Sequence, residues 1–388
     1  MKKTRQTPPS RGKLSVLRQI CNLIPNHLVP KLARETGAQK QARTFTPWGL
    51  HSGALSAIRG AKAPCRNTFS HANKTRDPAL AERLFWAVLE HLRTLSPRFA
   101  GGQRVRLAHR FRRTISVVDS TVLQLVANCL DWAKHRRRKA AAKCHLRLDL
   151  QSFLPVCAIV DVAREHDNVR AHQLCARLQA GEIVLFDKAY VDFEHLYALQ
   201  ERGVFWVTRA KDDLACRVVE KLPKSKDPRV RREDLIVLTV FYSRKAYPLR
   251  LRRVSARVEV DGREVERVFL TNHFGWSAGT VAELYRCRWQ IEVFFKQIKQ
   301  TLQLSDFLGN SANAVRWQVW TALLCYVLLR FLACVHGWHH SFTRLFTVLR
   351  STLWERWELG SLLGFYGTAG GSFRCLGQPQ QAWLLHES

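Results

Sequence analysis

The chain has 388 residues, more than one compact domain usually holds, so two or three structural units are expected. Hydrophobic residues make up 46% of it, which argues against wholesale disorder. Its 62 Lys and Arg against 31 Asp and Glu give a net charge of +31. Such self-repulsion is relieved by a polyanionic partner, so nucleic acid is the expected partner, with an anionic membrane surface as the alternative.

The positive charge is concentrated near the N-terminus. Residues 1–113 hold 23 Lys and Arg against 4 Asp and Glu, a net of +19 that leaves +12 for the rest. Residues 79–95 have apolar side chains at four-residue steps, a pattern typical of an amphipathic helix, and Gly101 and Gly102 follow. Residues 1–108 are therefore predicted to be a helical, basic DNA-binding domain.

The hydrophobic pattern changes near residue 114 and predicts an α/β segment over residues 109–213. One β-branched run, TISVVDSTVLQL, predicts a strand that ends at Asp119, and EIVLF predicts a buried strand that ends at Asp187. Further strands are predicted at 143–151, 154–162 and 204–210, and helices at 168–180 and 193–203.

Residues 214–275 contain only strand-like runs and are predicted to be a β-rich insertion. Asp261-Gly262 lies between two alternating runs and indicates a two-residue hairpin. A helix is predicted from Ser277, as N-cap, to about residue 302, within a second core segment, 276–336. The remainder, 337–388, is predicted to be a helical C-terminal segment and is a candidate for dimerisation.

One apolar stretch, residues 319–338, is long enough to suggest a membrane span. Arg330 lies near its middle, where a charge would be costly in lipid, so a buried helix is the favoured interpretation. The 11 cysteines are scattered without a C-x-x-C pair, a usage that fits reduced thiols and offers no zinc site. No apolar run follows the basic start, so a cytoplasmic, nucleoid-associated protein without a membrane partner is expected.

The helix that follows the β-rich segment carries a polar strip. Its residues Tyr285, Arg288, Glu292 and Lys299 lie within an arc of roughly 60°, since each residue turns the helix by about 100°. The apolar side chains on the adjoining arc are expected to be buried; they are Leu284, Ile291, Phe295 and Ile298. A solvated i,i+4 ion pair between Arg288 and Glu292 is the alternative explanation.

Asp119, Asp187 and Glu292 together have the chemistry of a two-metal phosphodiester site. Carboxylates can hold two Mg²⁺ ions roughly 3.5–4 Å apart, one beside the attacking oxygen and one beside the leaving oxygen. Each strand-end Asp alone is weak evidence, because such residues are often turn residues or caps. Arg288 and Lys299 are candidates to contact DNA phosphates, and Tyr285 to contact a phosphate oxygen or a base.

The spacing Tyr285-x2-Arg288-x3-Glu292-x6-Lys299 resembles the signature of the DDE transposases of bacterial insertion sequences, in the insertion-sequence-four family. The blocks VVDST, KCHLRLDLQSFLP, FDKAY, FWVTRAK and FLTN strengthen the resemblance, which covers about residues 60–350. The FDKAY block favours Asp187 as the second acidic residue over the nearby candidates Asp149, Asp161 and Asp167.

The resemblance implies a ribonuclease-H-like α/β core that is interrupted by the β-rich insertion. It also implies that Asp119, Asp187 and Glu292 hold two Mg²⁺ ions, with Mn²⁺ as a substitute. The implied activity is cut-and-paste DNA transposition by a homodimer that acts on double-stranded element ends and target DNA.

Two other basic features are candidates for DNA contact. Residues 134–143, KHRRRKAAAK, are expected to join two strands and to contact the DNA backbone through Arg136, Arg137 and Arg138; a solvated turn is the alternative. Lys188, next to Asp187, is the other candidate for a phosphate contact.

The chain departs from the family pattern near residues 48–51. In similar proteins the stretch after FTPW continues for some tens of residues, whereas here Trp48 and His51 are separated only by Gly49 and Leu50. This suggests an internal deletion in the DNA-binding domain. Two alternatives to an active transposase therefore stay open: a catalytically silent or end-binding-deficient copy that only binds DNA, and a related nuclease without strand transfer.

Overall fold

The computed structural model describes residues 8–38, 71, 74–101, 111, 113–125, 134–136, 139–162, 167–260, 262–302, 309 and 311–367. The chain forms two compact units. A helical unit comprises Met1–Gly101, Leu123–Ala141 and Lys296–Leu376, and a sheet unit comprises Gly102–Val122, Ala142–Phe295 and Gly377–Ser388. The five-segment division expected from the sequence is finer and stays a prediction. The shortened stretch at residues 48–51 lies outside the described residues.

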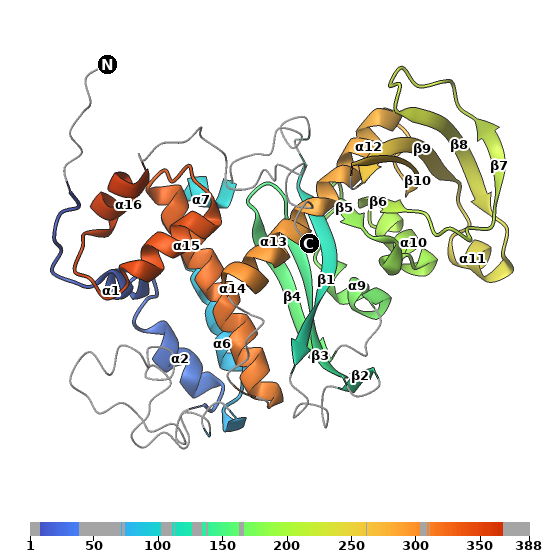
Figure 1. The fold of residues 1–388 in the computed structure, drawn as a ribbon. Helices are drawn as coiled ribbons and strands as arrows, with labels where there is room; N and C mark the ends of the chain where they lie inside the picture. Colours follow the sequence, from blue (N-terminus) through green and yellow to red (C-terminus); the bar gives the residue numbers. More distant parts are fainter. Residues whose placement is uncertain are drawn as a thin grey trace, which may run out of the picture. The chain divides into compact units, whose positions relative to one another are not determined.

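The helical unit is built around two long helices, α6 (Ala79–Leu95) and α14 (Ala312–Val335), which pack against each other (Figure 1). Trp320 of α14 contacts Phe85 and Trp86 of α6, with ring centroids 5.5 and 6.1 Å apart. The amphipathic helix predicted at residues 79–95 is confirmed. Within its described residues, this unit also contains α1 (Val16–Cys21), α2 (Leu28–Glu35), α7 (Pro97–Gly101), α15 (Phe342–Ser351) and α16 (Leu359–Gly367).

Helix α14 contains the stretch that resembles a membrane span. Among the described residues it is the one helix long and apolar enough to cross a bilayer by length and composition. Within the protein, 67% of its most apolar window is buried, as is usual for the core helix of a globular unit. A buried helix accounts for this stretch.

The sheet unit is a mixed α/β structure with one large sheet. In the described chain the strand order is β2-β3-β1-β5-β6-β10-β9-β8-β7, where β2 is Lys134–Arg136, and β4 pairs with β3 off this path. Strands β1, β5 and β6 are parallel, whereas β6 to β10 and the β10-β9-β8-β7 neighbours pair antiparallel. The strands are β1 (Ile115–Leu125), β3 (Lys139–Asp149), β4 (Leu154–Val162), β5 (Ile183–Phe186), β6 (Phe205–Arg209), β7 (Cys216–Lys221), β8 (Val230–Leu238), β9 (Leu251–Val260) and β10 (Arg263–Thr271).

Several strand boundaries differ from the sequence prediction: β3 covers Lys139–Asp149 rather than 143–151, and β6 covers Phe205–Arg209 rather than 204–210. Strand β1 does not end at Asp119 but continues to Leu125. Its continuous buried run, Ile115–Val118, stops just before Asp119, and Leu123 is the one buried residue after it, so the end of this run resembles a strand end. The segment 134–143 is not a simple connection, because β2 (Lys134–Arg136) pairs with the first residues of β3. A bulge between Lys134 and Arg136 accompanies this pairing. By contrast, β4 covers the predicted residues 154–162.

Helices α9 (Asp167–Cys175) and α10 (Phe193–Glu201) contribute to the core of the sheet unit. Trp206 of β6 is fully buried there and donates its indole N–H to the Leu196 carbonyl, 3.1 Å away. The same β-strand binds the end of β10: Asn272 accepts from the Trp206 amide at 2.9 Å and donates to the Val204 carbonyl at 2.9 Å. These buried hydrogen bonds hold β10 in register beside the parallel strands.

The stretch 214–275 contains the antiparallel strands β7 to β10. The expectation that it is all-β is wrong at one place, because Phe241–Ala246 form the short helix α11. The predicted hairpin is confirmed, because Val260 pairs with Arg263 across the turn. Gly262 has a φ of +72°, a backbone conformation that residues other than glycine rarely adopt.

The helix predicted from Ser277 to about 302 is confirmed, with local irregularities. It comprises α12 (Ala278–Arg286), a 3₁₀ turn (Cys287–Trp289), α13 (Gln290–Lys296) and a π-helical turn (Gln297–Thr301). Ser277 is the N-cap, and its hydroxyl accepts from the Thr280 amide. The four apolar side chains expected to be buried are all at most 7% exposed; they are Leu284, Ile291, Phe295 and Ile298.

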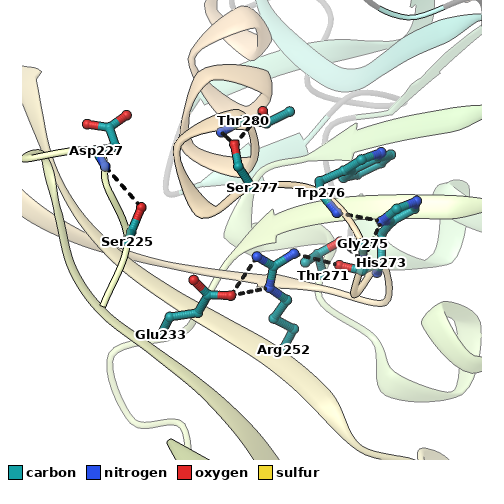
Figure 2. A network of polar contacts seen from close by, with 10 residues as sticks. All are labelled: Ser225, Asp227, Glu233, Arg252, Thr271, His273, Gly275, Trp276, Ser277 and Thr280. Atoms are coloured by element: carbon teal, nitrogen blue, oxygen red, sulfur yellow. Dashed lines mark hydrogen bonds and ion pairs between the residues drawn. The ribbon is translucent and has the colours of Figure 1, made fainter. Parts of the chain in front are cut away.

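A polar network fixes the turn that connects β10 to α12 (Figure 2). Arg252 of β9 donates twice to Glu233 of β8, at 2.9 and 2.6 Å, and once to the His273 carbonyl at 3.0 Å. The His273 ring nitrogen Nδ1 accepts from the amides of Gly275 and Trp276, each at 3.1 Å. The start of the helix is thereby attached to two neighbouring strands.

We expect Arg252→Met to lower the free energy of unfolding by about 3 kcal/mol, because it leaves a largely buried carboxylate, Glu233, without its partner. Denaturation in guanidinium chloride measures the change. Arg257→Met on the same strand is the matched control, since the Arg257–Glu264 pair is exposed and its loss is expected to have little effect. Equal effects of the two substitutions would contradict the structural role of Arg252.

Candidate active site

The parallel pairing of β1 and β5 brings the two predicted aspartates to neighbouring positions. Val118 is in register with Phe186, and Asp119 and Asp187 directly follow these two residues. Asp119 accepts from the Ser120 amide at 2.8 Å, and the Asp187 carbonyl accepts from the Tyr190 amide at 3.0 Å in the 3₁₀ turn Lys188–Tyr190. Two carboxylates from separate strands therefore lie at one position along the sheet.

Glu292 joins this pair through Arg288. From the 3₁₀ turn, Arg288 donates through Nη1 to Asp119 Oδ2 at 2.9 Å and through Nη2 to Glu292 Oε1 at 2.8 Å. The Arg288 side chain is only 9% exposed, so both ion pairs are shielded from water on the cation's side. The i,i+4 pair between Arg288 and Glu292 is present, but it is not the solvated pair of the alternative interpretation, because Asp119 shares the guanidinium.

Tyr285 connects the same helix to the second aspartate. Its hydroxyl donates to Asp187 Oδ1 at 3.2 Å, and its ring packs 4.8 Å from the ring of Phe269 on β10. The Arg288 guanidinium lies 5.8 Å from the centre of the Tyr285 ring. The three carboxylates are thus gathered around two adjacent side chains of one helix, Tyr285 and Arg288.

The electrostatics agree with a crowded acidic site. Burial raises the pKa of Asp119 to about 7, and the negative charges of Asp187 and Glu292 add to this increase, whereas Arg288 and the Ser120 amide oppose it. More positive charge near Asp119 would lower this pKa. A divalent cation is one source of such charge.

The donor chemistry suits Mg²⁺, although the side chains are not drawn together around an ion. In the described part of the chain, no three His, Cys, Asp or Glu side chains lie close enough to hold one metal ion. Asp119, Asp187 and Glu292 nevertheless supply hard oxygen ligands and interact with one another electrostatically. The residues fit divalent cations if Arg288 and Tyr285 yield their places to them.

Three of the residues predicted to contact DNA instead contact carboxylates of the protein. Arg288 and Tyr285 contact carboxylates, and Lys188 donates to Asp212 Oδ2 at 3.1 Å. Lys299 lies in the π-helical turn Gln297–Thr301, which belongs to the helical unit.

The predicted basic cluster of the connecting segment is only partly described. The backbone of Arg136 lies in β2, and Arg137 and Arg138 lie outside the described residues. Their contact with DNA stays a prediction.

The sequence argument missed two charged residues beside Lys188. Arg209 ends β6, and one of its guanidinium nitrogens lies 3.5 Å from Asp212 Oδ1. The signal was present in FWVTRAK: an arginine at the end of a buried strand that runs parallel to the strand before Asp187.

Comparison with known proteins identifies the family. The family model described as "Transposase DDE domain" matches residues 110–328. The chain is 31% identical over 234 residues to the probable transposase for insertion sequence element IS5377 of Geobacillus stearothermophilus, covering 59% of each chain. It is 30% identical over 255 residues to the putative transposase y4zB of Sinorhizobium fredii, covering 65% of this chain and 70% of the relative.

A third relative carries the name of the insertion-sequence-four group. The chain is 27% identical over 194 residues to transposase InsG for insertion sequence element IS4 of Escherichia coli, covering 48% of this chain and 42% of the relative. The match to the IS5377 protein likewise spans less than two thirds of that relative's length. The chain belongs to the DDE transposases of bacterial insertion sequences, in the insertion-sequence-four family.

Proposed function

We propose that this protein is a DNA transposase that binds the ends of its insertion sequence, cleaves the DNA strands and joins them to target DNA. The observation that carries this proposal is the convergence of Asp119, Asp187 and Glu292 on Tyr285 and Arg288 of one helix. Family membership and the net charge of +31 support a DNA substrate.

We further propose a ribonuclease-H-like core with an inserted β-rich segment. The strand order β4-β3-β1-β5-β6, with β1, β5 and β6 parallel, supports such a core. The antiparallel run β7 to β10 would then be the insertion between the second and third acidic residues. In this arrangement the helix that carries Glu292 returns to the core after the insertion.

Asp119, Asp187 and Glu292 would hold two divalent cations, Mg²⁺ by preference and Mn²⁺ as a substitute. When bound, these ions stabilise negative charge on the attacking and leaving oxygens and make an attacking hydroxyl a better nucleophile. The protein's own contribution is to keep three carboxylates at fixed positions on a sheet and a packed helix. Without ions, Arg288 offsets the negative charge and Tyr285 positions Asp187.

The proposed substrates and partners follow from this function. Double-stranded DNA would be bound both as element end and as target, by a homodimer that pairs two ends in the bacterial cytoplasm at the nucleoid. Lys188, Lys299 and Arg136 are proposed phosphate contacts, as are Arg137 and Arg138, because their cationic side chains can pair with the backbone of any sequence.

Cleavage of a labelled duplex that carries the element's own end tests the proposal. Wild type with Mg²⁺ is expected to cut at the end, whereas Glu292→Gln is expected to lose activity by at least about 100-fold, because the amide keeps the shape but not the charge that binds metal. Glu283→Gln, on the same helix and outside the acidic site, is the matched control.

The products distinguish the alternatives. Joining of a 3′ end to a second duplex identifies a transposase, and cutting without joining identifies a nuclease. DNA binding by both proteins without cutting would contradict the proposal and favour a silent copy.

Melting of an Arg288→Met variant tests, without an activity assay, whether Mg²⁺ can replace the positive charge of Arg288. In EDTA we expect this variant to melt at a lower temperature than wild type, with a loss of about 3 kcal/mol, because Asp119 and Glu292 lose their shared partner. Added Mg²⁺ is expected to raise its melting temperature more than that of wild type, since the ions replace the missing positive charge. Arg286→Met, an exposed neighbour, is the control. A Mg²⁺ response no larger than that of wild type would be evidence against carboxylate-bound ions.

A further inference from the structure

Two cations from different elements share one exposed carboxylate beside the candidate active site. Lys188 Nζ lies 3.1 Å from Asp212 Oδ2, and an Arg209 guanidinium nitrogen lies 3.5 Å from Asp212 Oδ1. Each carboxylate oxygen therefore faces its own cation. Two non-bridging oxygens of a phosphodiester can be bound by a lysine and an arginine in the same way.

This cluster lies at the carboxyl-terminal ends of the parallel strands β5 and β6, beside Asp187. Lys188 directly follows Asp187. Arg209 occupies the position on β6 that is equivalent to Asp187, because Phe186 is in register with Thr208 on the parallel strands. The charge of Arg209 also acts on the phenol of Tyr285, which is hydrogen-bonded to Asp187. An anion held between Lys188 and Arg209 would lie next to the acidic centre.

Exposure shows that Asp212 is easily displaced. Its side chain is 78% exposed, against 40% for Lys188 and 20% for Arg209. Water screens such ion pairs strongly, so they contribute little to the stability of the fold. The two cations are more firmly positioned than Asp212. The Arg209 side chain is largely buried, and the backbone of Lys188 directly follows the buried strand β5 and Asp187. The position is built for an anion, and Asp212 is its weakly held occupant.

We propose that Lys188 and Arg209 form a binding site for one phosphodiester of DNA next to the acidic centre, and that Asp212 occupies this site in the DNA-free protein. Asp212 competes with DNA from within the same chain and moves out into solvent when a phosphate arrives. The identity of the ligand as DNA rests on the proposed function; the geometry of the two cations and their carboxylate does not.

Duplex binding without divalent metal tests this site independently of cleavage. We expect Asp212→Asn to lower the Kd for a fluorescent duplex by about threefold or more, because a nearby like charge is removed from the phosphate's position. Asp213→Asn makes the same charge change at the next residue, which is also exposed, and is the matched control.

A double-substitution cycle makes the test specific. In an Arg209→Gln background the gain from Asp212→Asn is expected to disappear, since the site has lost one of its two cations. If wild type binds DNA but Asp212→Asn and Asp213→Asn have equal effects, this inference is overturned while the proposed function stands. If no variant binds DNA, the proposed function fails and the phosphate site fails with it.

Discussion

Repulsion among three carboxylates is the constraint on which the arrangement of this centre depends. The parallel pairing of β1 and β5 brings Asp119 and Asp187 side by side, and a helix adds Glu292. Like charges in a partly buried position are unfavourable unless a cation neutralises them. Burial raises the pKa of Asp119, and the charges of Asp187 and Glu292 add to this increase. Arg288 supplies neutralising charge through its ion pairs with Asp119 and Glu292.

The rest of the sheet unit serves to hold the helix against the sheet. Arg252 fixes the turn at the helix start, Asn272 bonds β10 to β6, and the apolar face of the helix is buried. The proposed phosphate site uses the same architecture, because the parallel strands β5 and β6 end beside each other and place Lys188 near Arg209. Strand register therefore places both the Asp119–Asp187 pair and the two cations of the proposed phosphate site.

Local pattern predicted the helix at residues 79–95, the strand at 154–162 and the N-cap at Ser277, because apolar periodicity and capping depend on neighbours in sequence. It did not predict that β1 continues past Asp119, since a change in burial looks like a strand end. The helical periodicity placed Tyr285, Arg288 and Glu292 on one strip of the helix, but it did not predict which residues of the sheet these side chains contact. The contacts with Asp119, Asp187 and Asp212 join residues 24 to 169 positions apart, which depend on tertiary packing alone.

The most direct measurement of the central claim is where a bound metal lies. Fe²⁺ in place of Mg²⁺, with ascorbate and peroxide, generates hydroxyl radicals that cut the backbone next to the ion, and mass spectrometry identifies the fragments. Cuts near residues 119, 187 and 292 that excess Mg²⁺ suppresses are the predicted result. Cuts confined to other parts of the chain, or cuts that Mg²⁺ leaves unchanged, would contradict an ion site formed by these three carboxylates.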